Sequence, residues 1–213
     1  KKPVFFGLDA KNDFYAKNIK NSGDGKVLAT LCFDNNNIDV EIPAIGTYMV
    51  TNALAAAAAG KLLGLTDEEI ANGVASYKTV GSRANVINTG KIKIIDDCYN
   101  ANPTSVRASL DTLSNLDGRK VAILGDMKEL GSEELKLHFD TGVYAKSKDI
   151  GTVITVGELA KELAKGADGK AFDTIEDAKP EILKTIKSGD VVLVKASHSM
   201  QFENIVEFLK QNF

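Results

Sequence analysis

Residues 92–116 read IKIIDDCYNANPTSVRASLDTLSNL, and the order of residue types in them predicts a strand, a polar loop and a helix. Ile92 to Asp96 is short, apolar and β-branched, which predicts a buried strand. Apolar residues recur every three or four positions over Val106 to Leu116, which predicts a helix with one buried face. A strand that leads directly into such a helix is the unit from which parallel sheets are built.

The same alternation continues toward the C-terminus. Further apolar runs predict strands, and the amphipathic runs between and after them predict helices. This pattern predicts an α/β fold with a parallel sheet that is covered by helices on both faces. The predicted strands are Val121 to Leu124, Val153 to Val156 and Val191 to Val194, and the predicted helices are Glu133 to Ser147, Leu159 to Lys165, Ala178 to Ile186 and Phe202 to Gln211.

The N-terminal region, up to a change of pattern near Ser82, has short strands and turns before two helices. The first helix, Thr51 to Leu63, is expected to end at Gly64. A capping box of Thr66 and Glu69 is expected to open the second helix. That helix is predicted over Ile70 to Tyr77, and the predicted strands are Val4 to Leu8, Lys26 to Phe33 and Asn37 to Ile42, with turns at Ser22 to Gly25 and Asn35-Asn36.

The composition excludes several classes of protein. The 213 residues are 44% hydrophobic and 26% charged, which is enough apolar content to bury a core, so a disordered chain is excluded. The formal net charge of −3 gives no overall basic field for nucleic acid or an anionic membrane. No apolar run reaches the roughly 18 residues that cross a bilayer. We expect a cytoplasmic protein that binds neither nucleic acid nor a membrane.

The two cysteines, Cys32 and Cys98, lie in strand-like apolar runs and cannot form a disulfide framework. We expect both to be buried free thiols. The two cysteines and two histidines lack the spacing of a zinc site, so no metal site is predicted in this chain.

Polar residues follow the predicted strands at the edge where parallel α/β sheets bind ligands. The segment Asp96 to Pro103 is the richest, with carboxylates suited to ribose hydroxyls or a cation and with asparagines that both donate and accept. The alternative is an ordinary loop in which Thr104 or Ser105 caps the next helix. The other polar strand ends are Gly125 to Leu130, Gly157-Glu158 and Lys195 to Ser199.

Single residues near these strand ends have a structural and a functional interpretation. We expect Gly125 to permit a close backbone approach, Asp126 to cap or hold a neighbour, and His138 to be a satisfied histidine on a helix face. Arg83 pairs either with a phosphate or with a surface carboxylate. Lys195 to Ser199 suits a carboxylate or phosphate near a helix N-terminus, or is a solvated loop.

The sequence contains no phosphate cradle of its own. A P-loop needs Gly-Lys followed by Ser or Thr. The four Gly-Lys pairs of this chain are followed instead by Val27, Leu62, Ile92 and Ala171, and no Gly-x-Gly-x-x-Gly fingerprint is present.

Four segments resemble motifs of the Mur ligase family, in the order in which that family has them. Asp96 to Pro103 is similar to its Asp-Asp-Ser-Tyr-Asn-Ala-Asn-Pro motif. Gly125 to Gly131 matches Gly-Asp-Met-x-Glu-Leu-Gly, with His138 at the expected distance. Asn52 to Ala57 resembles a helix of the central domain, and Leu193 to Ser197 resembles Leu-Val-Lys-Gly-Ser. By this resemblance the chain is identified as a member of the branch of the family that adds D-alanyl-D-alanine.

The resemblance implies that residues 1–83 are the C-terminal part of a central ATP-binding domain and that residues 84–213 are a Rossmann-like C-terminal domain. It implies an ATP-dependent amide ligase of peptidoglycan precursor synthesis. Such an enzyme uses ATP and Mg²⁺ to join D-Ala-D-Ala to UDP-N-acetylmuramoyl-tripeptide through an acyl phosphate. The P-loop, the magnesium ligands and the main catalytic residues are expected upstream of Lys1. This chain alone is therefore expected to be inactive, and the whole enzyme to be a monomer.

The resemblance also assigns roles to eight residues. The nucleotide-binding residues are Tyr48 and Asn52 for adenine and Arg83 and Asp97 for the phosphate and ribose of ATP. The residues that face the dipeptide or the acyl phosphate are Asn100, Asn102, Lys195 and Ser197. The sequence departs from the family pattern at Tyr48, Asn85, Cys98, Ala196 and His198.

Two other interpretations stay open. In the first, the chain is a non-catalytic α/β module that binds a nucleotide or peptide in a ligase-like cleft. This interpretation accounts for the missing P-loop. A related ligase that adds a single amino acid, such as a diamino acid or glutamate, fits less well, because Tyr99 to Pro103 is of the D-alanyl-D-alanine type.

Overall fold

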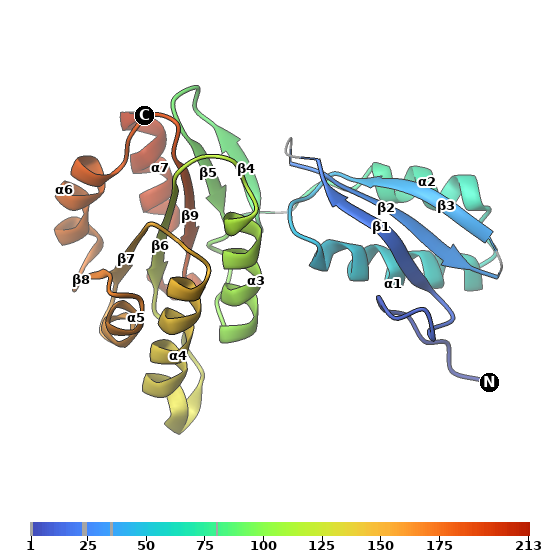
Figure 1. Ribbon diagram of the computed structural model, residues 1–213, viewed down its shortest axis with the longest axis horizontal. Coiled ribbons are helices and arrows are strands. Elements are labelled where there is room, and N and C mark those ends of the chain that lie inside the picture. The colour runs from blue at the N-terminus through green and yellow to red at the C-terminus, as the bar shows by residue number, and fades with distance from the viewer. Residues whose placement is uncertain (1, 23–24, 35, 80) are drawn as a thin grey trace. The chain divides into compact units, whose positions relative to one another are not determined.

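The computed structural model describes residues 2–22, 25–34, 36–79 and 81–213, and the chain divides into two compact units, Lys1–Thr79 and Val80–Phe213. Each unit is built on a sheet of its own (Figure 1). The turns predicted at Ser22 to Gly25 and at Asn35-Asn36 include Gly23, Asp24 and Asn35, which lie outside the described residues.

The first unit is an antiparallel sheet with two helices packed on one face. Alternate residues of its central strand, such as Leu31 and Phe33, join Leu54 and Ile70 of the helices in one buried cluster. The strands, in the spatial order β1-β2-β3, are β1 (Tyr15–Asn21), β2 (Val27–Phe33) and β3 (Asn36–Ile42), and the helices are α1 (Tyr48–Leu62) and α2 (Asp67–Ala75).

The strand predicted over Val4 to Leu8 is wrong. In that region only Phe6 forms an isolated bridge, with Phe14, and Phe5 and Phe6 are largely exposed. β1 lies further along the chain, in a segment that carries two lysines and two asparagines and is mostly exposed. The apolar run predicted a strand, but hydrogen bonding to β2 selects the more polar segment.

The predicted helix signals in this unit are confirmed, although both helices begin three residues earlier than predicted. Gly64 has a φ of +90°, and the Leu65 N–H donates to the Gly60 carbonyl over 3.0 Å, which satisfies the end of α1. At α2 the Glu69 N–H donates to Thr66 Oγ1 (3.2 Å), and the Thr66 N–H donates to Glu69 Oε2 (2.8 Å). This is the capping box that the sequence predicts.

The second unit is an α/β fold around a six-stranded sheet in the order β4-β5-β9-β6-β7-β8. β4 is antiparallel to β5, and the other neighbours are parallel, which confirms the predicted mostly parallel sheet. β4 and β8 were not predicted, because both are short edge strands with exposed residues and lack an apolar run. The strands are β4 (Asn85–Asn88), β5 (Lys93–Asp96), β6 (Lys120–Gly125), β7 (Thr152–Val156), β8 (Lys170–Phe172) and β9 (Val191–Lys195).

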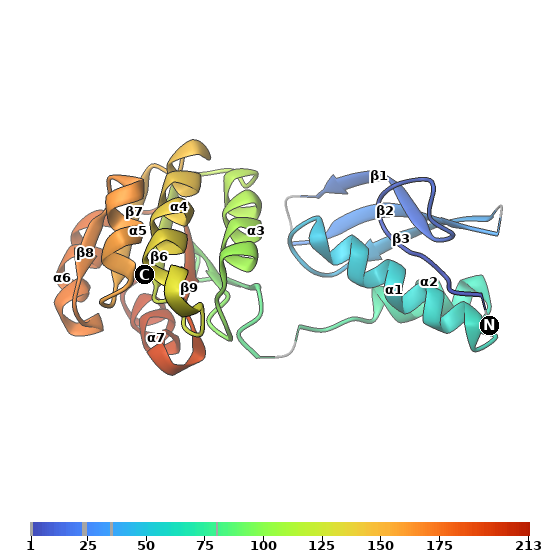
Figure 2. The same cartoon turned by 90° about the horizontal axis from the view of Figure 1, so that it is seen from below.

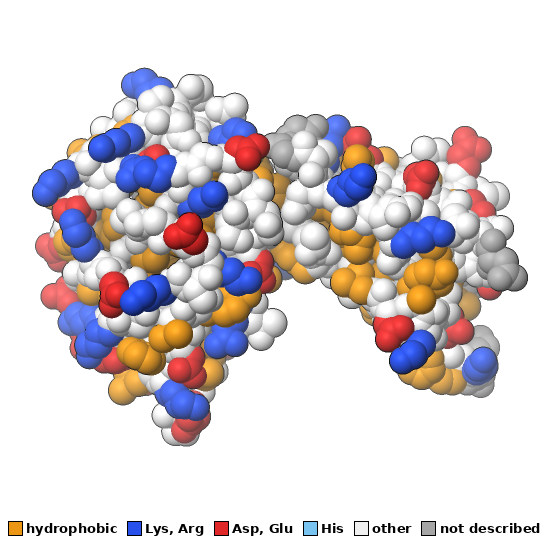
Figure 3. All heavy atoms as spheres, in the orientation of Figure 1, with side chains coloured by type: hydrophobic (Ala, Val, Ile, Leu, Met, Phe, Trp, Pro, Cys, Tyr) orange, Lys and Arg blue, Asp and Glu red, His pale blue; other side chains and the backbone are white. Residues whose placement is uncertain are grey.

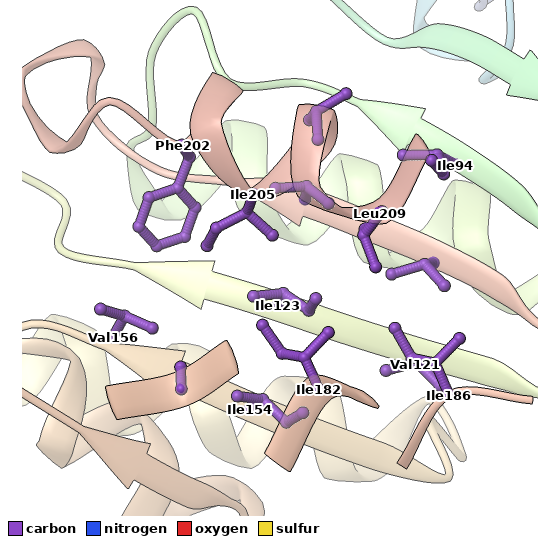
Figure 4. Packing of buried hydrophobic residues seen from close by; sticks show 14 of the residues in the cluster. Ile94, Val121, Ile123, Ile154, Val156, Ile182, Ile186, Phe202, Ile205 and Leu209 are labelled. Atoms are coloured by element: carbon purple, nitrogen blue, oxygen red, sulfur yellow. The ribbon is translucent and has the colours of Figure 1, made fainter. Parts of the chain in front are cut away.

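Helices cover both faces of this sheet, as predicted. α6 (Ile175–Thr185) and α7 (Glu203–Asn212) pack on one face, where Figure 4 shows Ile182 and Ile205 against Ile123 and Ile154 of the strands. The other face is covered by α3 (Pro103–Ser114), α4 (Glu134–Ser147) and α5 (Ala160–Ala167) (Figure 2). Short 3₁₀ turns, η1 (Gly131–Glu133) and η2 (His198–Met200), follow β6 and β9. No helix in the described part of the chain is both long and apolar enough to cross a membrane.

α4 and α5 touch backbone to backbone, and this contact depends on two glycines. A Cβ atom added to Gly142 would lie 2.0 Å from the carbonyl oxygen of Leu163, and one added to Gly166 would lie 2.3 Å from that of Phe139. No side chain fits at either position, because real Cβ contacts are essentially never shorter than 3.0 Å.

We predict that Gly142→Ala lowers the free energy of unfolding by about 2 kcal/mol or more, because the helices must move apart in a packed interior. Urea denaturation measures this change. Gly151→Ala is the matched control in the same unit, since a Cβ there would meet only the Lys120 carbonyl oxygen, at 3.7 Å. Equal effects of the two substitutions would contradict the close helix contact.

Candidate ligand site at the carboxyl edge of the parallel sheet

The predicted site residues of the second unit gather where the chain changes sides of the sheet. β5 leads to α3 on one face, whereas its parallel neighbour β9 leads to α7 on the opposite face. The two strands end together, since Asp96 is in register with Val194. Loops that diverge to opposite faces leave a crevice between them, and such switch points are where open α/β sheets bind ligands.

A buried ion pair joins the two loops at this point. Lys195 Nζ lies 2.7 Å from Asp97 Oδ2, and only 3% of the lysine side chain and 12% of the aspartate side chain are exposed. The ammonium also donates to the Asn100 carbonyl oxygen (2.8 Å) and lies 3.5 Å from the Asp97 carbonyl oxygen. Lys195 therefore holds the loop after β5 from the end of β9.

Asp97 uses its remaining acceptor positions on two other segments. Its Oδ1 accepts from the Ala84 N–H (3.0 Å), and its Oδ2 accepts from the Ser109 hydroxyl on α3 (2.7 Å). The Tyr99 N–H in the same loop donates to the Ser82 carbonyl (2.9 Å). Residues 82–84 are thus attached to the sheet edge by their backbone.

Arg83 is exposed beside this loop. Its guanidinium carbon lies 3.7 Å from the centre of the Tyr99 ring, and the His198 ring lies 5.9 Å from the same ring, centre to centre. Within the described residues, no carboxylate pairs with Arg83. The surface salt bridge, which was one of the two alternatives from the sequence, is therefore not formed among these residues. A stacked guanidinium with free N–H groups is suited to phosphate or carboxylate.

Asn100 and Asn102 each use the side-chain oxygen locally. Asn100 Oδ1 accepts from the Ala101 N–H, and Asn102 Oδ1 accepts from the Ser105 N–H, both over 2.8 Å. Asn102 is therefore the N-cap of α3, so the capping by Thr104 or Ser105 that the ordinary-loop alternative includes is not formed, although Ser105 is the reciprocal partner in the capping box. Neither Nδ2 group donates a hydrogen bond within the described part of the chain, so both amides keep donors for a ligand.

Ser197 connects the loop after β9 to the loop after β6. Its Oγ accepts from the Lys128 N–H (2.9 Å), and its own N–H donates to the Asp126 carbonyl (3.1 Å). The Asp126 carboxylate accepts from the Ala160 N–H at the start of α5 (2.8 Å) and pairs with Lys128 Nζ (2.7 Å). The structural role predicted for Asp126 is confirmed.

Gly125, the last residue of β6, permits the close approach predicted for it. A Cβ atom there would lie 2.5 Å from Phe202 Cζ and 2.7 Å from Ala196 Cβ. The absence of a side chain at Gly125 therefore makes room for Ala196, the residue that stands where the family motif has glycine.

His138 is fully buried and satisfied, as predicted. Its Nε2 accepts from the Met127 N–H (2.9 Å), so Nδ1 carries the proton and donates to the Glu134 carbonyl (2.6 Å). The ring fixes the loop after β6 to α4 and lies outside the exposed part of the site.

We predict that His138→Leu destabilises the protein by about 2 kcal/mol, because it leaves the buried Met127 N–H without an acceptor. Chemical denaturation measures the loss. His198→Leu, at an exposed histidine of the same unit, is expected to stay within about 0.5 kcal/mol of the parent protein. A loss at position 198 as large as that at position 138 would contradict the buried hydrogen bond.

Cys32 and Cys98 are buried free thiols, as predicted. Burial, followed by the negative charge of Asp96, raises the pKa of the Cys98 thiol far above its ordinary value. Because the thiolate is the reactive form, Cys98 has the features of a structural and not a nucleophilic cysteine.

We predict that iodoacetamide at pH 8 labels less than about a tenth of Cys98 in the folded protein, and all of it in guanidinium chloride. Mass spectrometry of the peptide that contains Cys98 gives both values. Rapid labelling of the folded protein would show that the thiol is accessible and ionised.

The other two predicted nucleotide-binding residues lie in the first unit, on the first turns of α1. Tyr48 is the first residue of α1, and the exposed Asn52 side chain has its Nδ2 3.4 Å from Met49 Sδ. Asn52 also lines an apolar groove of about 320 Å³ between α1 and α2, together with Ala53, Ala56 and Tyr77.

The described residues include no group of three or more histidine, cysteine or acidic side chains that could hold a metal ion. On the face of the molecule in Figure 3, basic and acidic side chains are interspersed over the unit that holds the parallel sheet.

Sequence reasoning missed several groups that complete the site. They are the backbones of Ser82 and Ala84 and the Ser109 hydroxyl. The sequence contains a weak indication of the role of Ser109, because Ser109 is a polar residue next to Leu110 on the buried face of a predicted helix. The sequence contains no indication of the backbone contacts, since a residue of almost any type can supply them.

Comparison with known protein families agrees with this geometry. The family model of the Mur ligase glutamate ligase domain matches residues 82–198, and that of the Mur ligase middle domain matches residues 1–60. The chain belongs to the Mur ligase family. The resemblance drawn from the four sequence motifs is thereby confirmed.

Individual Mur ligases align with nearly the whole chain. It is 34% identical to the UDP-N-acetylmuramoyl-tripeptide–D-alanyl-D-alanine ligase of Bacillus subtilis, over 96% of this chain and 46% of that protein. A crystal structure of MurF from Acinetobacter baumannii superposes with a TM-score of 0.91 at 30% identity, covering 98% of this chain and 46% of that one. MurF ligase from Thermotoga maritima, in complex with ADP, gives a TM-score of 0.87 at 27% identity, with 98% and 48% covered. The chain spans about half the length of the curated relatives it matches.

Proposed function

We propose that this chain is the C-terminal half of an ATP-dependent ligase that joins D-alanyl-D-alanine to UDP-N-acetylmuramoyl-tripeptide in peptidoglycan synthesis. Residues 1–83 are the end of its central ATP-binding domain, and residues 84–213 are its C-terminal domain. The enzyme acts as a cytoplasmic monomer. The observation that carries the proposal is the set of unused hydrogen-bond donors at the switch point of the parallel sheet, on segments that carry the family motifs.

The reaction requires a phosphoryl transfer followed by an acyl transfer. The tripeptide carboxylate attacks the γ-phosphorus of ATP and gives an acyl phosphate and ADP. The dipeptide amine then attacks the acyl carbon, and inorganic phosphate leaves as the amine loses a proton and the amide forms. Both steps develop negative charge on phosphoryl or carbonyl oxygens, so positioned cations and N–H donors accelerate them.

For the second substrate, the chain supplies donors at the loop after β5 and at the loop after β9. The unused Nδ2 groups of Asn100 and Asn102 and the hydroxyl proton of Ser197 are suited to the dipeptide carboxylate or to the acyl phosphate. Asp97 and Lys195 lie at the same edge and are bonded to each other.

For the nucleotide, the chain supplies Asn52, Tyr48 and Arg83. The exposed amide of Asn52 can donate to and accept from an adenine edge, and the Tyr48 ring at the start of α1 can stack on it. Arg83 offers an exposed guanidinium to a phosphate. The described residues hold no group of three or more histidine, cysteine or acidic side chains, and we assign the Mg²⁺ ligands and the phosphate cradle of the proposed enzyme to its part upstream of Lys1.

The decisive experiment is to sequence the reading frame upstream of Lys1 and to assay the protein it encodes. We expect phosphate release that requires ATP, UDP-N-acetylmuramoyl-tripeptide and D-Ala-D-Ala together. A preference for a single amino acid over the dipeptide would instead support the related-ligase interpretation. A frame that begins at Lys1, with nucleotide or peptide binding and no phosphate release, would support the binding module.

We predict that Asn52→Ala in this enzyme raises the KM for ATP about tenfold and leaves the KM for D-Ala-D-Ala unchanged, because only the adenine contact is lost. Asn72→Ala is the control, since Asn72 is an exposed asparagine on α2 of the same unit. Steady-state kinetics with each substrate varied in turn gives both constants. A change confined to the dipeptide KM would remove Asn52 from the nucleotide site.

A further inference from the structure

Lys195 has no N–H donor left for a substrate. A lysine ammonium has three donors, and three acceptors lie within 3.5 Å of Lys195 Nζ: the Asp97 carboxylate, the Asn100 carbonyl and the Asp97 carbonyl. With 3% of its side chain exposed, it also has almost no surface that a ligand can reach. The position at the end of β9 suggests substrate binding, but the contacts are internal.

The groups that Lys195 holds lead to two different ligand-binding elements. Through the Asn100 carbonyl it fixes the residue whose amide is proposed for the dipeptide or acyl phosphate. Through the Asp97 carboxylate it fixes the Ala84 N–H, and Ala84 directly follows Arg83. One ion pair therefore sets the positions of Asn100 and Arg83 relative to each other.

We infer that Asp97 and Lys195 form a positioning pair for the ligation reaction and that Lys195 contacts neither substrate. The pair holds the Arg83 segment and the Asn100 loop in the one arrangement that presents both to their ligands. This inference rests on the proposed function, and it assigns to the pair a role different from separate contacts to the nucleotide and the dipeptide.

The two possibilities predict different kinetics. If Asp97 bound the nucleotide and Lys195 the dipeptide, each substitution would raise the KM of one substrate, and the effects would add in the double variant. If the two residues act as one positioning pair, breaking it from either side displaces both elements. Each single variant then weakens the use of both substrates, and the double variant is no worse than the more severe single variant.

The test is a double-mutant cycle with Asp97→Asn, Lys195→Met and the double variant in the full-length enzyme. We expect each variant to lower kcat/KM for ATP and for D-Ala-D-Ala by roughly 10- to 100-fold, the scale of a misplaced binding group. Lys210→Met is the control, because Lys210 pairs with Glu207 on the surface of α7. Additive effects, each confined to one substrate, would overturn the inference.

Ser109→Ala is a milder variant that tests the same inference if Asp97→Asn or Lys195→Met does not fold. It deletes one donor to the Asp97 carboxylate from a helix position that accepts alanine, and the Ser109 side chain is buried. We expect kcat/KM to fall about fivefold for both substrates. A fall confined to ATP would mean that Asp97 acts on the nucleotide alone.

A second readout needs no catalysis. Hydrogen exchange at the Ala84 and Tyr99 amides, measured without substrates, is expected to be at least about tenfold faster in Lys195→Met than in Lys210→Met. Unchanged exchange would overturn the positioning role, whereas a wild-type enzyme that does not ligate the dipeptide would overturn the proposed function. The two failures are therefore distinguishable.

Discussion

The ion pair between Asp97 and Lys195 is the interaction on which the ligand edge of the second unit depends. Burying both charges costs several kcal/mol, and their attraction roughly offsets this, so the pair adds little net stability. Removing one partner alone destabilises the protein, because the buried charge that remains is uncompensated and costs about 3–5 kcal/mol. The pair therefore selects one conformation of the loops around it more than it stabilises the fold.

The placement of that pair follows from the topology of the sheet. β9 lies between β5 and β6, and the helices that follow its two neighbours cover the face opposite to α7. The loop after β9 must therefore lead to the face opposite to the one that the loops on both sides lead to. Polar groups are buried where these loops meet, and each needs a partner from another loop, as Asp97 and Lys195 provide for each other.

Backbone groups carry much of the connection between the loops. Ser197 bonds to the main chain of Asp126 and Lys128, and His138 bonds to the main chain of Met127. These bonds fix the loop after β6 against β9 on one side and against α4 on the other. The segments of Arg83 and Asn100, whose side chains are exposed, are likewise held through main-chain groups, the Ala84 N–H and the Asn100 carbonyl, and groups held in place before a ligand binds reduce the ordering cost of binding.

The sequence by itself determined the parallel core, the helix caps with local signals and the family, because each of these depends on residues close together in the chain. Apolar runs predicted β5, β6, β7 and β9, and the capping box of Thr66 and Glu69 predicted the start of α2. The tertiary structure alone decided the edge strands β1, β4 and β8, since an edge strand is defined by its neighbour and not by its own apolar pattern. It also decided the contacts of Lys195. The motif identifies Lys195 as a cation near the ligand, but only the packing of β9 against the loop after β5 places three acceptors around its ammonium. These acceptors use all three N–H donors, so none is left for a ligand.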